Sequence, residues 1–324
     1  MTDRDEASKP TIEIKAFETL ELGAPIDLLV TCHGYESRST AHLGMTMGDV
    51  NRRISFGFDF PSEDDESFGR ISVARDKLMD AGFEVYVLDD EGVERRLRNE
   101  LAALPSDRNV RVVADISSMN RGRIASIILA CSSASFALCD LDLVYFPSSF
   151  GSHKHDYEPL ESFGPIHNDL AGWPEDPDFP LALIIGLGTE PGRADGVLES
   201  LEPSVVSLFE SFGGEDGYPE EILKENQRVI GVVGRPTNYP LRDPLQTYLL
   251  ISAAVDRLSE HSRVVIVPMG PKIFCALTVA VALTHGGDIG VWKASAGRGV
   301  NPIDVKEYGP PVITRLKFVP IIGM

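Results

Sequence analysis

The chain of 324 residues lacks any apolar run of the roughly 18 residues that a membrane-spanning helix requires. The segment 1–10 is charged and contains no apolar signal-peptide core, so the sequence does not predict export. Cysteine is scarce, and no C-x-x-C pair occurs among Cys32, Cys131, Cys139 and Cys275. We therefore expect a cytoplasmic protein with reduced thiols, no zinc site and no membrane partner.

Basic residues are also in short supply. The chain has 30 Lys and Arg against 49 Asp and Glu, which gives a formal net charge of −19. A surface this acidic repels a phosphate backbone, so duplex DNA or RNA is not an expected partner. A small anionic ligand remains compatible with this charge, because a pocket needs only a few cations.

Several motifs of well-known sites are missing. No G-x-G-x-x-G follows the first apolar strand, and no G-x-x-x-x-G-K-[ST] occurs anywhere in the chain. A G-x-S-x-G elbow and an H-E-x-x-H pair are absent as well. These absences disfavour a standard dinucleotide site, a P-loop, a serine hydrolase and a zinc protease. We identify no cofactor from the sequence.

What the sequence does contain is an alternation of short apolar runs, typical of buried parallel strands, with amphipathic segments typical of helices. We expect strands at 11–17, 26–30, 54–58, 85–88, 110–114, 141–146, 181–185, 205–209, 263–267, 289–292 and 312–320. We expect helices at 72–81, 91–104, from about 121, 193–201, 219–227, from 244 and at 273–284, and an acidic loop at 62–66. The alternation predicts an α/β protein made of two tandem Rossmann-like domains, each with a doubly wound parallel sheet.

The expected domain boundaries follow from composition. An N-terminal lead covers 1–24 and a first Rossmann-like domain covers 25–150. The segment 151–180 is rich in Gly, Pro, Ser, His and Asp, which is typical of a linker. A second Rossmann-like domain then covers 181–300, and the segment 301–324 adds a C-terminal strand.

The two halves contain motifs in the same order and at nearly the same separation. The first half has Gly34-Tyr-Glu36-Ser-Arg38 and later VRVVADISSMNR, which ends at Arg121. The second half has Gly188-Thr-Glu-Pro-Gly-Arg and later SRVVIVPMGPK, which ends at Lys272. The match favours an internal duplication, although two unrelated doubly wound domains would also look alike at this level.

All of these motifs follow predicted strands, where parallel α/β sheets bind ligands and where helix N-termini attract anions. We expect a phosphate- or nucleotide-type site made by Gly34, Glu36, Arg38, Asp115, Ser117, Ser118, Arg121, Glu190, Arg193, Gly270 and Lys272. In the alternative interpretation, Asp115 and Ser117 cap a helix, and Glu36 and Arg38 form an ion pair that holds a loop.

Other polar residues are weaker candidates. His153-x-His155-Asp156 could bind a metal if extended, but two solvated linker histidines explain the same residues. His33 could act as a general base or be an ordinary loop histidine. Ser295, Arg298 and the glycines around it could form a phosphate-contacting loop or a flexible turn.

The motifs with Glu36 and Arg38, Asp115 to Arg121, Glu190, and Gly270 and Lys272 resemble those of a poorly characterised bacterial family. Its members are similar to components found near anti-phage defence genes. The layout of two Rossmann-like halves is also similar, in architecture only, to tandem CARF-type and SAVED-type sensors, which bind cyclic oligonucleotides.

Three functions stay open at this point. The duplicated anion-friendly turns favour a sensor of a small nucleotide-like ligand that signals to a protein partner in a defence system. A nucleotide-processing enzyme of N-glycosidase or phosphodiesterase type would use Glu36 or Asp115 as base or nucleophile. A scaffold subunit of a defence complex would need no ligand. The sequence leaves a homodimer open in each case.

Overall fold

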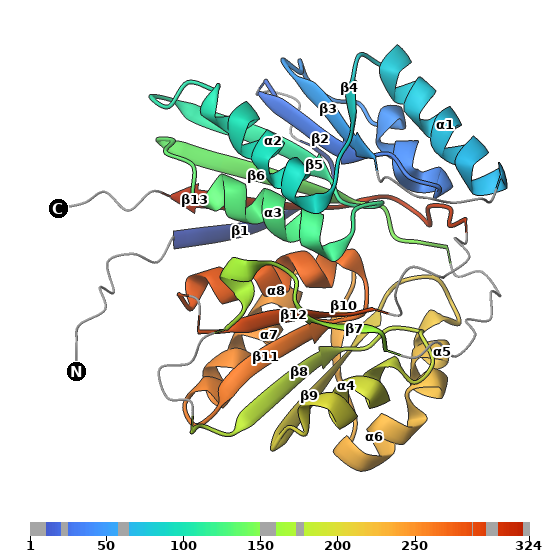
Figure 1. The fold of residues 1–324 in the computed structure, drawn as a ribbon, viewed down its shortest axis with the longest axis vertical. Helices are drawn as coiled ribbons and strands as arrows, with labels where there is room; N and C mark the ends of the chain where they lie inside the picture. Colours follow the sequence, from blue (N-terminus) through green and yellow to red (C-terminus); the bar gives the residue numbers. More distant parts are fainter. Residues whose placement is uncertain are drawn as a thin grey trace. The chain divides into compact units, whose positions relative to one another are not determined.

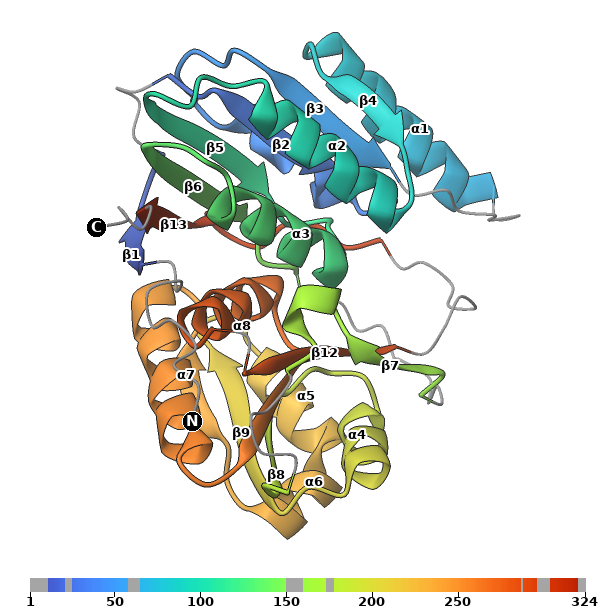
Figure 2. The same ribbon diagram turned by 60° about the vertical axis from the view of Figure 1, so that its left-hand side comes forward.

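In a computed structural model, the chain forms two compact units. The structure describes residues 11–20, 25–57, 65–149, 160–172, 178–286, 288–295 and 304–319. The first unit consists of Met1–Ser149 with Pro302–Met324, and the second of Phe150–Asn301. Each unit is a single sheet with helices on both faces (Figures 1 and 2). Within the described ranges, no helix is both long and apolar enough to cross a membrane.

The first unit is built around a seven-stranded sheet. Its strands are β1 (Thr11–Phe17), β2 (Leu28–Cys32), β3 (Arg53–Gly57), β4 (Glu84–Val87), β5 (Asn109–Asp115), β6 (Leu138–Tyr145) and β13 (Val312–Val319). The order across the sheet is β1-β13-β6-β5-β2-β3-β4. Strands β2 to β6 pair in parallel, whereas β13 is antiparallel to both β6 and β1.

Helices cover both faces of this first sheet. They are η2 (Ser37–Gly44), α1 (Asp65–Asp80), α2 (Asp90–Ala102) and α3 (Arg121–Ser132). Leu78 of α1 belongs to a buried cluster with Val113 and Val144 of the sheet, and α2 packs beside α3 on the other face (Figure 1). Gly82 follows α1 at a φ of 82°, the left-handed conformation expected where this helix ends.

The second unit has a six-stranded sheet. Its strands are β7 (Ser162–Pro165), β8 (Leu181–Gly186), β9 (Val205–Phe212), β10 (Thr237–Pro240), β11 (Arg263–Pro268) and β12 (Gly290–Ser295). The order is β10-β9-β8-β11-β12-β7, with β8 to β12 in parallel and β7 antiparallel to β12. All six residues of β8 are buried, which explains its uninterrupted apolar sequence.

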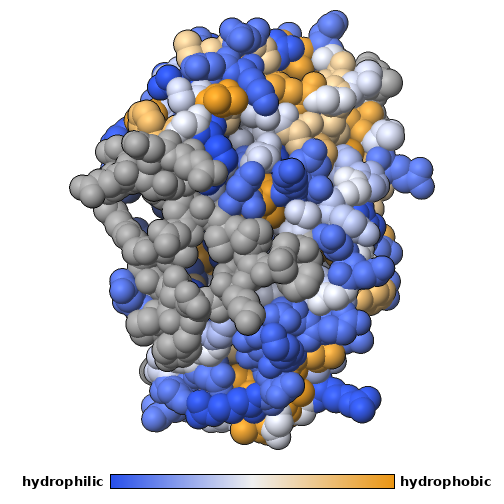
Figure 3. Space-filling model, turned by 90° about the vertical axis from the view of Figure 1, so that its right-hand side faces the viewer, coloured by the Kyte–Doolittle hydropathy of each residue, from blue (hydrophilic) through white to orange (hydrophobic). Residues whose placement is uncertain are grey.

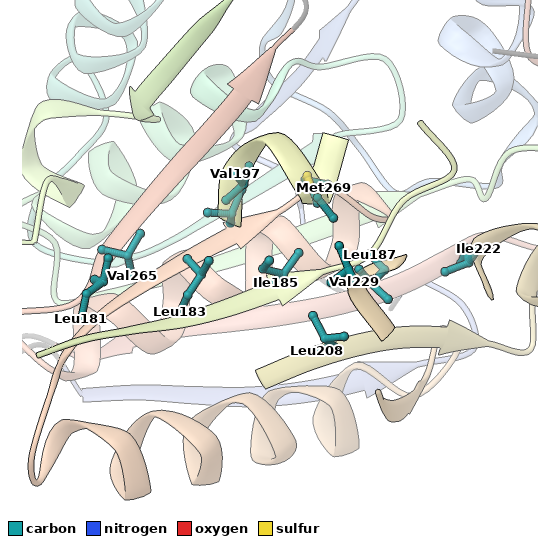
Figure 4. Close-up of a cluster of buried hydrophobic side chains, with 12 residues drawn as sticks. Leu181, Leu183, Ile185, Leu187, Val197, Leu208, Ile222, Val229, Val265 and Met269 are labelled. Carbon is teal, nitrogen blue, oxygen red and sulfur yellow. The ribbon is translucent and has the colours of Figure 1, made fainter. Parts of the chain in front are cut away.

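The helices of the second unit also lie on both faces. They are η3 (Asn168–Leu170), α4 (Arg193–Leu201), α5 (Tyr218–Glu225), α6 (Gln227–Val233), α7 (Pro244–Ser259) and α8 (Lys272–Thr284). A buried cluster joins α4, α5 and α6 to the sheet, and Figure 4 shows Leu187, Leu208, Ile222 and Val229 within it. The side chain of Asp243 caps α7 by accepting a hydrogen bond from the N–H of Gln246, as its sequence predicts.

The two sheets share one strand order. In each sheet the first parallel strand, β2 or β8, lies between the second strand and the fourth, and an antiparallel strand follows the fifth. This arrangement confirms the predicted fold class of two Rossmann-like units with mostly parallel sheets. The internal duplication stays a prediction, because a shared strand order can also arise independently.

Some elements differ from the expectations. Helix α1 begins at Asp65, so part of the expected acidic loop at 62–66 is helical, and 62–64 lie outside the described residues. The segment 151–180, interpreted as a linker, contains the edge strand β7 and the short helix η3. Strand β10 and helices η2 and α6 were not expected. These elements are short, so they carry little periodicity in the sequence.

Strand β13 belongs to the first sheet although 160 or more residues of chain separate it from β6, and buried charges hold it there. Asp142 of β6 is 1% exposed. Its carboxylate accepts hydrogen bonds from Arg111 of β5 at 2.9 Å and from Arg315 of β13 at 2.6 Å. One buried carboxylate therefore joins three neighbouring strands.

We expect Asp142→Asn to lower the free energy of unfolding of the first unit by about 3 kcal/mol, because it removes the counter-charge shared by the buried guanidinium of Arg111 and the largely buried one of Arg315. Urea unfolding followed by circular dichroism measures the change. Glu13→Gln is the matched control, since the exposed Glu13–Lys317 pair also joins β13 to its neighbour and should contribute less than about 1 kcal/mol. Equal effects of the two substitutions would contradict this account.

Candidate functional site

Each sheet has one place where consecutive crossovers leave to opposite faces. In the first unit this point lies between β2 and β5, and in the second between β8 and β11. Ligands of open parallel sheets bind beyond the strand ends at such a point. The predicted residues of the first unit lie at or just after the ends of β2 and β5, and those of the second unit lie just after β8 and β11. The structure therefore brings each set of residues to one edge of its own sheet.

In the first unit, Glu36 and Arg38 bind each other. The Nε of Arg38 donates to a carboxylate oxygen of Glu36 at 2.7 Å, and its Nη1 donates to the carbonyl oxygen of Phe146 at 2.9 Å. Burial alone would lower the pKa of Arg38, but Glu36 and Tyr145 outweigh it and the pKa rises. These contacts agree with the alternative interpretation, in which the Glu36–Arg38 ion pair holds the loop after β2 in place.

Asp115, at the end of β5, is the centre of a buried hydrogen-bond network. One carboxylate oxygen accepts from the backbone N–H of Ser117 at 2.9 Å and from its hydroxyl at 2.5 Å. The other oxygen lies 2.7 Å from the Nδ1 of His42 on η2. The Ser117 hydroxyl in turn accepts from the N–H of Phe146. Both oxygens of Asp115 are thus engaged within the protein, which explains its burial.

His42 was not a candidate from the sequence, and its imidazole is held through one nitrogen. The ring is 1% exposed. Among the described residues its Nε2 has no hydrogen-bond partner, and the same holds for the hydroxyls of Ser39 and Ser118. Ser39 and His42 share a face of η2, because residues three apart eclipse one another in a 3₁₀-helix. Ser118 lies in the turn after β5, beside this junction.

Arg123, which the sequence analysis did not identify, is buried at this edge of the sheet. Its side chain is 1% exposed and pairs with Asp90 at 3.0 Å. Its Nη2 donates to the carbonyl oxygens of Gly57 and Leu88 at 3.1 and 2.8 Å, so it joins the ends of β3 and β4. Arg121, the predicted anion contact, is half-buried at the first position of α3. The sequence RGR gives no signal that the second arginine is the structural one.

The returning C-terminal segment also contacts the loop after β2. The carboxylate of Asp304 accepts hydrogen bonds from the backbone N–H and the hydroxyl of Ser37, both at 2.7 Å. Burial alone would raise the pKa of Asp304, but these two hydrogen bonds lower it. Tyr308 donates its N–H to the carbonyl oxygen of Pro147. Chain from the far end of the sequence therefore fixes this edge of the first unit.

In the second unit, two loops meet at the switch between β8 and β11. A Cβ on Gly188 would lie 2.8 Å from the carbonyl oxygen of Met269, and a Cβ on Gly270 would lie 2.7 Å from that of Leu187. A carboxylate oxygen of Glu190 also lies in the space that a side chain at 188 would need. The two glycines therefore allow the loops that lead into α4 and α8 to pack backbone against backbone.

Both helices that start at this switch begin with a cation and lack a side-chain cap. Helix α4 begins at Arg193 after Gly192, and α8 begins at Lys272 after Pro271. In the first unit, by contrast, Asn120 caps α3 by accepting from the N–H of Arg123 at 2.7 Å. Helix N-termini carry partial positive charge from their N–H groups, and at α4 and α8 no side-chain cap offsets it.

Glu210, near the end of β9, is a further residue that the sequence analysis missed. It is 6% exposed. The described residues form no hydrogen bond or ion pair with its carboxylate. Burial, together with the nearby charge of Glu220, raises its pKa. A buried titratable group with a shifted pKa at a strand end is typical of functional sites. The apolar sequence of β9 gives no signal for it before its burial is known.

The remaining candidates are not brought into these edges. His153, His155, Asp156 and Arg298 lie outside the described residues. Ser295 is the last residue of β12. In the ranges that the structure describes, no three His, Cys, Asp or Glu residues lie close enough to hold a metal ion.

An open apolar groove lies outside these edges in the described part of the second unit. It has a volume of about 470 Å³ on α5 and α6 and is lined by Glu220, Leu223, Lys224, Gln227, Ile230 and Gly231. On the face shown in Figure 3, hydrophilic residues are interspersed with small hydrophobic areas.

Comparison with known proteins gives little beyond the fold. No family model and no curated protein matches the chain. One similar solved structure is a Type III CRISPR defence DNA nuclease activated by cyclic oligoadenylate, with 8% identity, a TM-score of 0.44, and coverage of 80% of this chain and 64% of the nuclease chain. Another is phosphoethanolamine N-methyltransferase 1 of Haemonchus contortus, with 8% identity, a TM-score of 0.22, and coverage of 91% and 88%. Neither likeness says what this chain binds.

We expect the stability of the first unit to depend on pH through His33, whose Nδ1 lies 2.9 Å from the hydroxyl of Ser55. Burial and the charges of Arg123 and Arg75 lower its pKa from 6.5 to about 4. The unfolded chain therefore binds the proton first, and stability is full above pH 6.5 and falls between 6.5 and 4 by up to about 3 kcal/mol. Unfolding at several pH values tests this, with His33→Asn as the comparison; a wild-type profile no steeper than that variant's would refute it.

The contact between the two loops of the second unit makes a separate prediction. Gly270→Ala should lower the free energy of unfolding by about 1–3 kcal/mol, because the added methyl group meets a backbone carbonyl that cannot move freely. Gly231→Ala is the control, since nothing lies within 4 Å of a Cβ there and alanine favours the helix. Equal thermal stability of the two variants would show that the loops do not pack as described.

Proposed function

We propose that the protein is a sensor that binds a small anionic, nucleotide-like ligand at the switch between β8 and β11 of the second unit. The observation that carries this proposal is the pair of helices α4 and α8, which both start at this point with a cation and without a side-chain cap. Two positive helix ends beside Arg193 and Lys272 favour an anion, even on a chain with a strongly negative net charge.

A second observation supports the same place. Glu210 lies near the end of the neighbouring strand β9, level with Leu187, and burial together with the charge of Glu220 raises its pKa. An anion-binding helix start next to an unpaired carboxyl suits a ligand that has both a phosphate and hydrogen-bond donors, as a nucleotide does. The other predicted residues here, Glu190 and Gly270, lie in the two loops that meet at this switch.

The first unit is the weaker candidate for the ligand. Glu36, Arg38, Asp115 and Ser117 are engaged with one another or with the backbone. A general base or nucleophile must be able to reach a substrate, so these contacts do not favour the enzyme alternative for Glu36 and Asp115. We propose that this unit passes the signal to a protein partner. The motif resemblance to a family similar to anti-phage defence components supports a role in defence.

Thermal unfolding with a panel of mononucleotides, NAD and cyclic oligonucleotides tests the site. At a concentration of 100 times the dissociation constant, a ligand adds about 2.7 kcal/mol to stability. Lys272→Met should weaken binding about tenfold or more, because it removes a charged hydrogen-bond donor. Arg257→Gln, at the last turn of α7 on the opposite edge of the sheet, should leave binding unchanged.

Two outcomes would overturn this function. If the wild-type protein binds none of these compounds, the sensor proposal fails. If chromatography shows that a bound nucleotide is consumed, the protein is an enzyme and not a sensor.

A further inference from the structure

The groove on α5 and α6 follows one face of each helix. Its residues have the spacing i, i+3, i+4 on both helices, with Glu220, Leu223 and Lys224 on α5 and Gln227, Ile230 and Gly231 on α6. Leu223 is 40% exposed. A Cβ on Gly231 would meet nothing within 4 Å. This side of the second unit therefore has an apolar surface that no described side chain fills.

Negative charge surrounds the groove, and the cations beside it do not balance this charge. The Nζ of Lys224 lies 3.0 Å from carboxylate oxygens of both Glu221 and Glu225. Arg228, which follows the groove residue Gln227, also pairs with two carboxylates, on α4, at 3.4 and 2.9 Å. Each of these two cations is outnumbered two to one, so the groove has a local excess of negative charge.

Glu220 adds a carboxylate that no described cation meets. It lines the groove and forms no ion pair within the part of the chain that the structure describes. Burial raises the pKa of Glu210 on β9, and the charge of Glu220 adds to this rise, while no cation opposes it. A positive group brought to the groove would therefore be attracted by both carboxylates.

The combination of apolar surface and negative charge selects among the possible occupants. Nucleic acid and an anionic membrane carry the wrong charge. A second copy of this chain has a net charge of −19 and the same acidic groove. A helix with one apolar face and with lysine or arginine beside that face matches both features, and apolar grooves commonly bind such segments.

We propose that the groove on α5 and α6 is the docking site for a basic amphipathic helix of a partner protein. The apolar side chains of that helix cover Leu223 and Ile230, and a lysine or arginine reaches Glu220. The inference goes beyond the proposed function, because it depends neither on the ligand nor on the contact that we propose for the first unit.

Fluorescence anisotropy with labelled synthetic peptides and the purified full-length protein tests this docking site. The probe is a leucine–lysine peptide of about four helical turns, with its leucines on one helical face. One control peptide has glutamate in place of lysine. The other has leucine at every second position, so that it has no apolar face as a helix. We expect the probe to bind at least about tenfold more tightly than either control.

A matched pair of glycine substitutions locates the binding. Gly231→Trp fills the groove without meeting other atoms near its Cβ. Gly69→Trp, on α1 of the first unit, is the control, because a Cβ there also meets nothing within 4 Å. We expect Gly231→Trp to weaken binding of the probe about tenfold or more, as burial of the apolar face is lost, whereas Gly69→Trp binds as the wild type does. Thermal unfolding shows whether both variants are folded.

The charge at the groove is tested separately. Glu220→Gln should weaken binding of the probe about threefold and reduce its dependence on salt concentration, because it removes an exposed charge of opposite sign. Glu260→Gln, an exposed carboxylate at the end of α7, is the control and should change neither.

Several outcomes would overturn the inference. It is refuted if the probe does not bind, if the three peptides bind alike, or if Gly231→Trp binds the probe as Gly69→Trp does. Sedimentation velocity and flotation with phosphatidylcholine–phosphatidylserine vesicles examine the other occupants. A dimer, or vesicle binding, that Gly231→Trp abolishes would assign the groove to a second copy or to a lipid surface instead.

Discussion

A doubly wound parallel sheet has an edge at which the backbone turns away in two directions, and the protein must satisfy the polar groups exposed there. This constraint shapes both units. In the first unit, the buried Arg123 donates hydrogen bonds to the carbonyl oxygens of Gly57 and Leu88, at the ends of β3 and β4. Asp115 contacts both the turn after β5 and His42 on the helix η2. The first unit thus satisfies this edge with its own side chains. In the second, the loops are held by backbone contacts between glycines, and two helix starts lack side-chain caps.

The five parallel strands of the first unit and four of the five in the second could be predicted, because each is a short apolar run bounded by Gly, Pro or charged residues. Helix limits were predictable where a cap has a chemical signature, as at Asp243 and Gly82. The pairing of β13 with β6 could not be, since it depends on Arg315 reaching Asp142 across most of the chain. Strands β7 and β10 have four residues each, too few to show a period.

The positions of the candidate residues at strand ends could be predicted, and their role in binding a ligand stays a prediction. Motif spacing placed Gly34, Asp115, Gly188 and Gly270 at strand ends, because parallel strands bring such turns to one edge. The spacing of the motifs does not show which charged group each side chain will bind. Glu36 and Arg38 look like ligand contacts in sequence and bind each other in the structure. Arg123 looks like any helix cation and is the most buried of them. Glu210 lies inside an apolar strand, where a charged residue attracts attention only once its burial is known.

Under the proposed function, the Glu190 carboxylate links the binding of an anion to a movement of the loop before α4. It lies against Gly188, in the loop that continues through Gly192 into α4. An anionic ligand at the start of this helix would repel Glu190 and occupy its space. The left-handed conformation at Gly192 makes the loop before α4 able to reorient without strain on a side chain. Helix α4 packs against α6 beneath it, so a displaced loop changes the packing of a surface helix. Under this proposal, ligand binding displaces the loop and the start of the surface helix that follows it, which is how a sensor affects a partner.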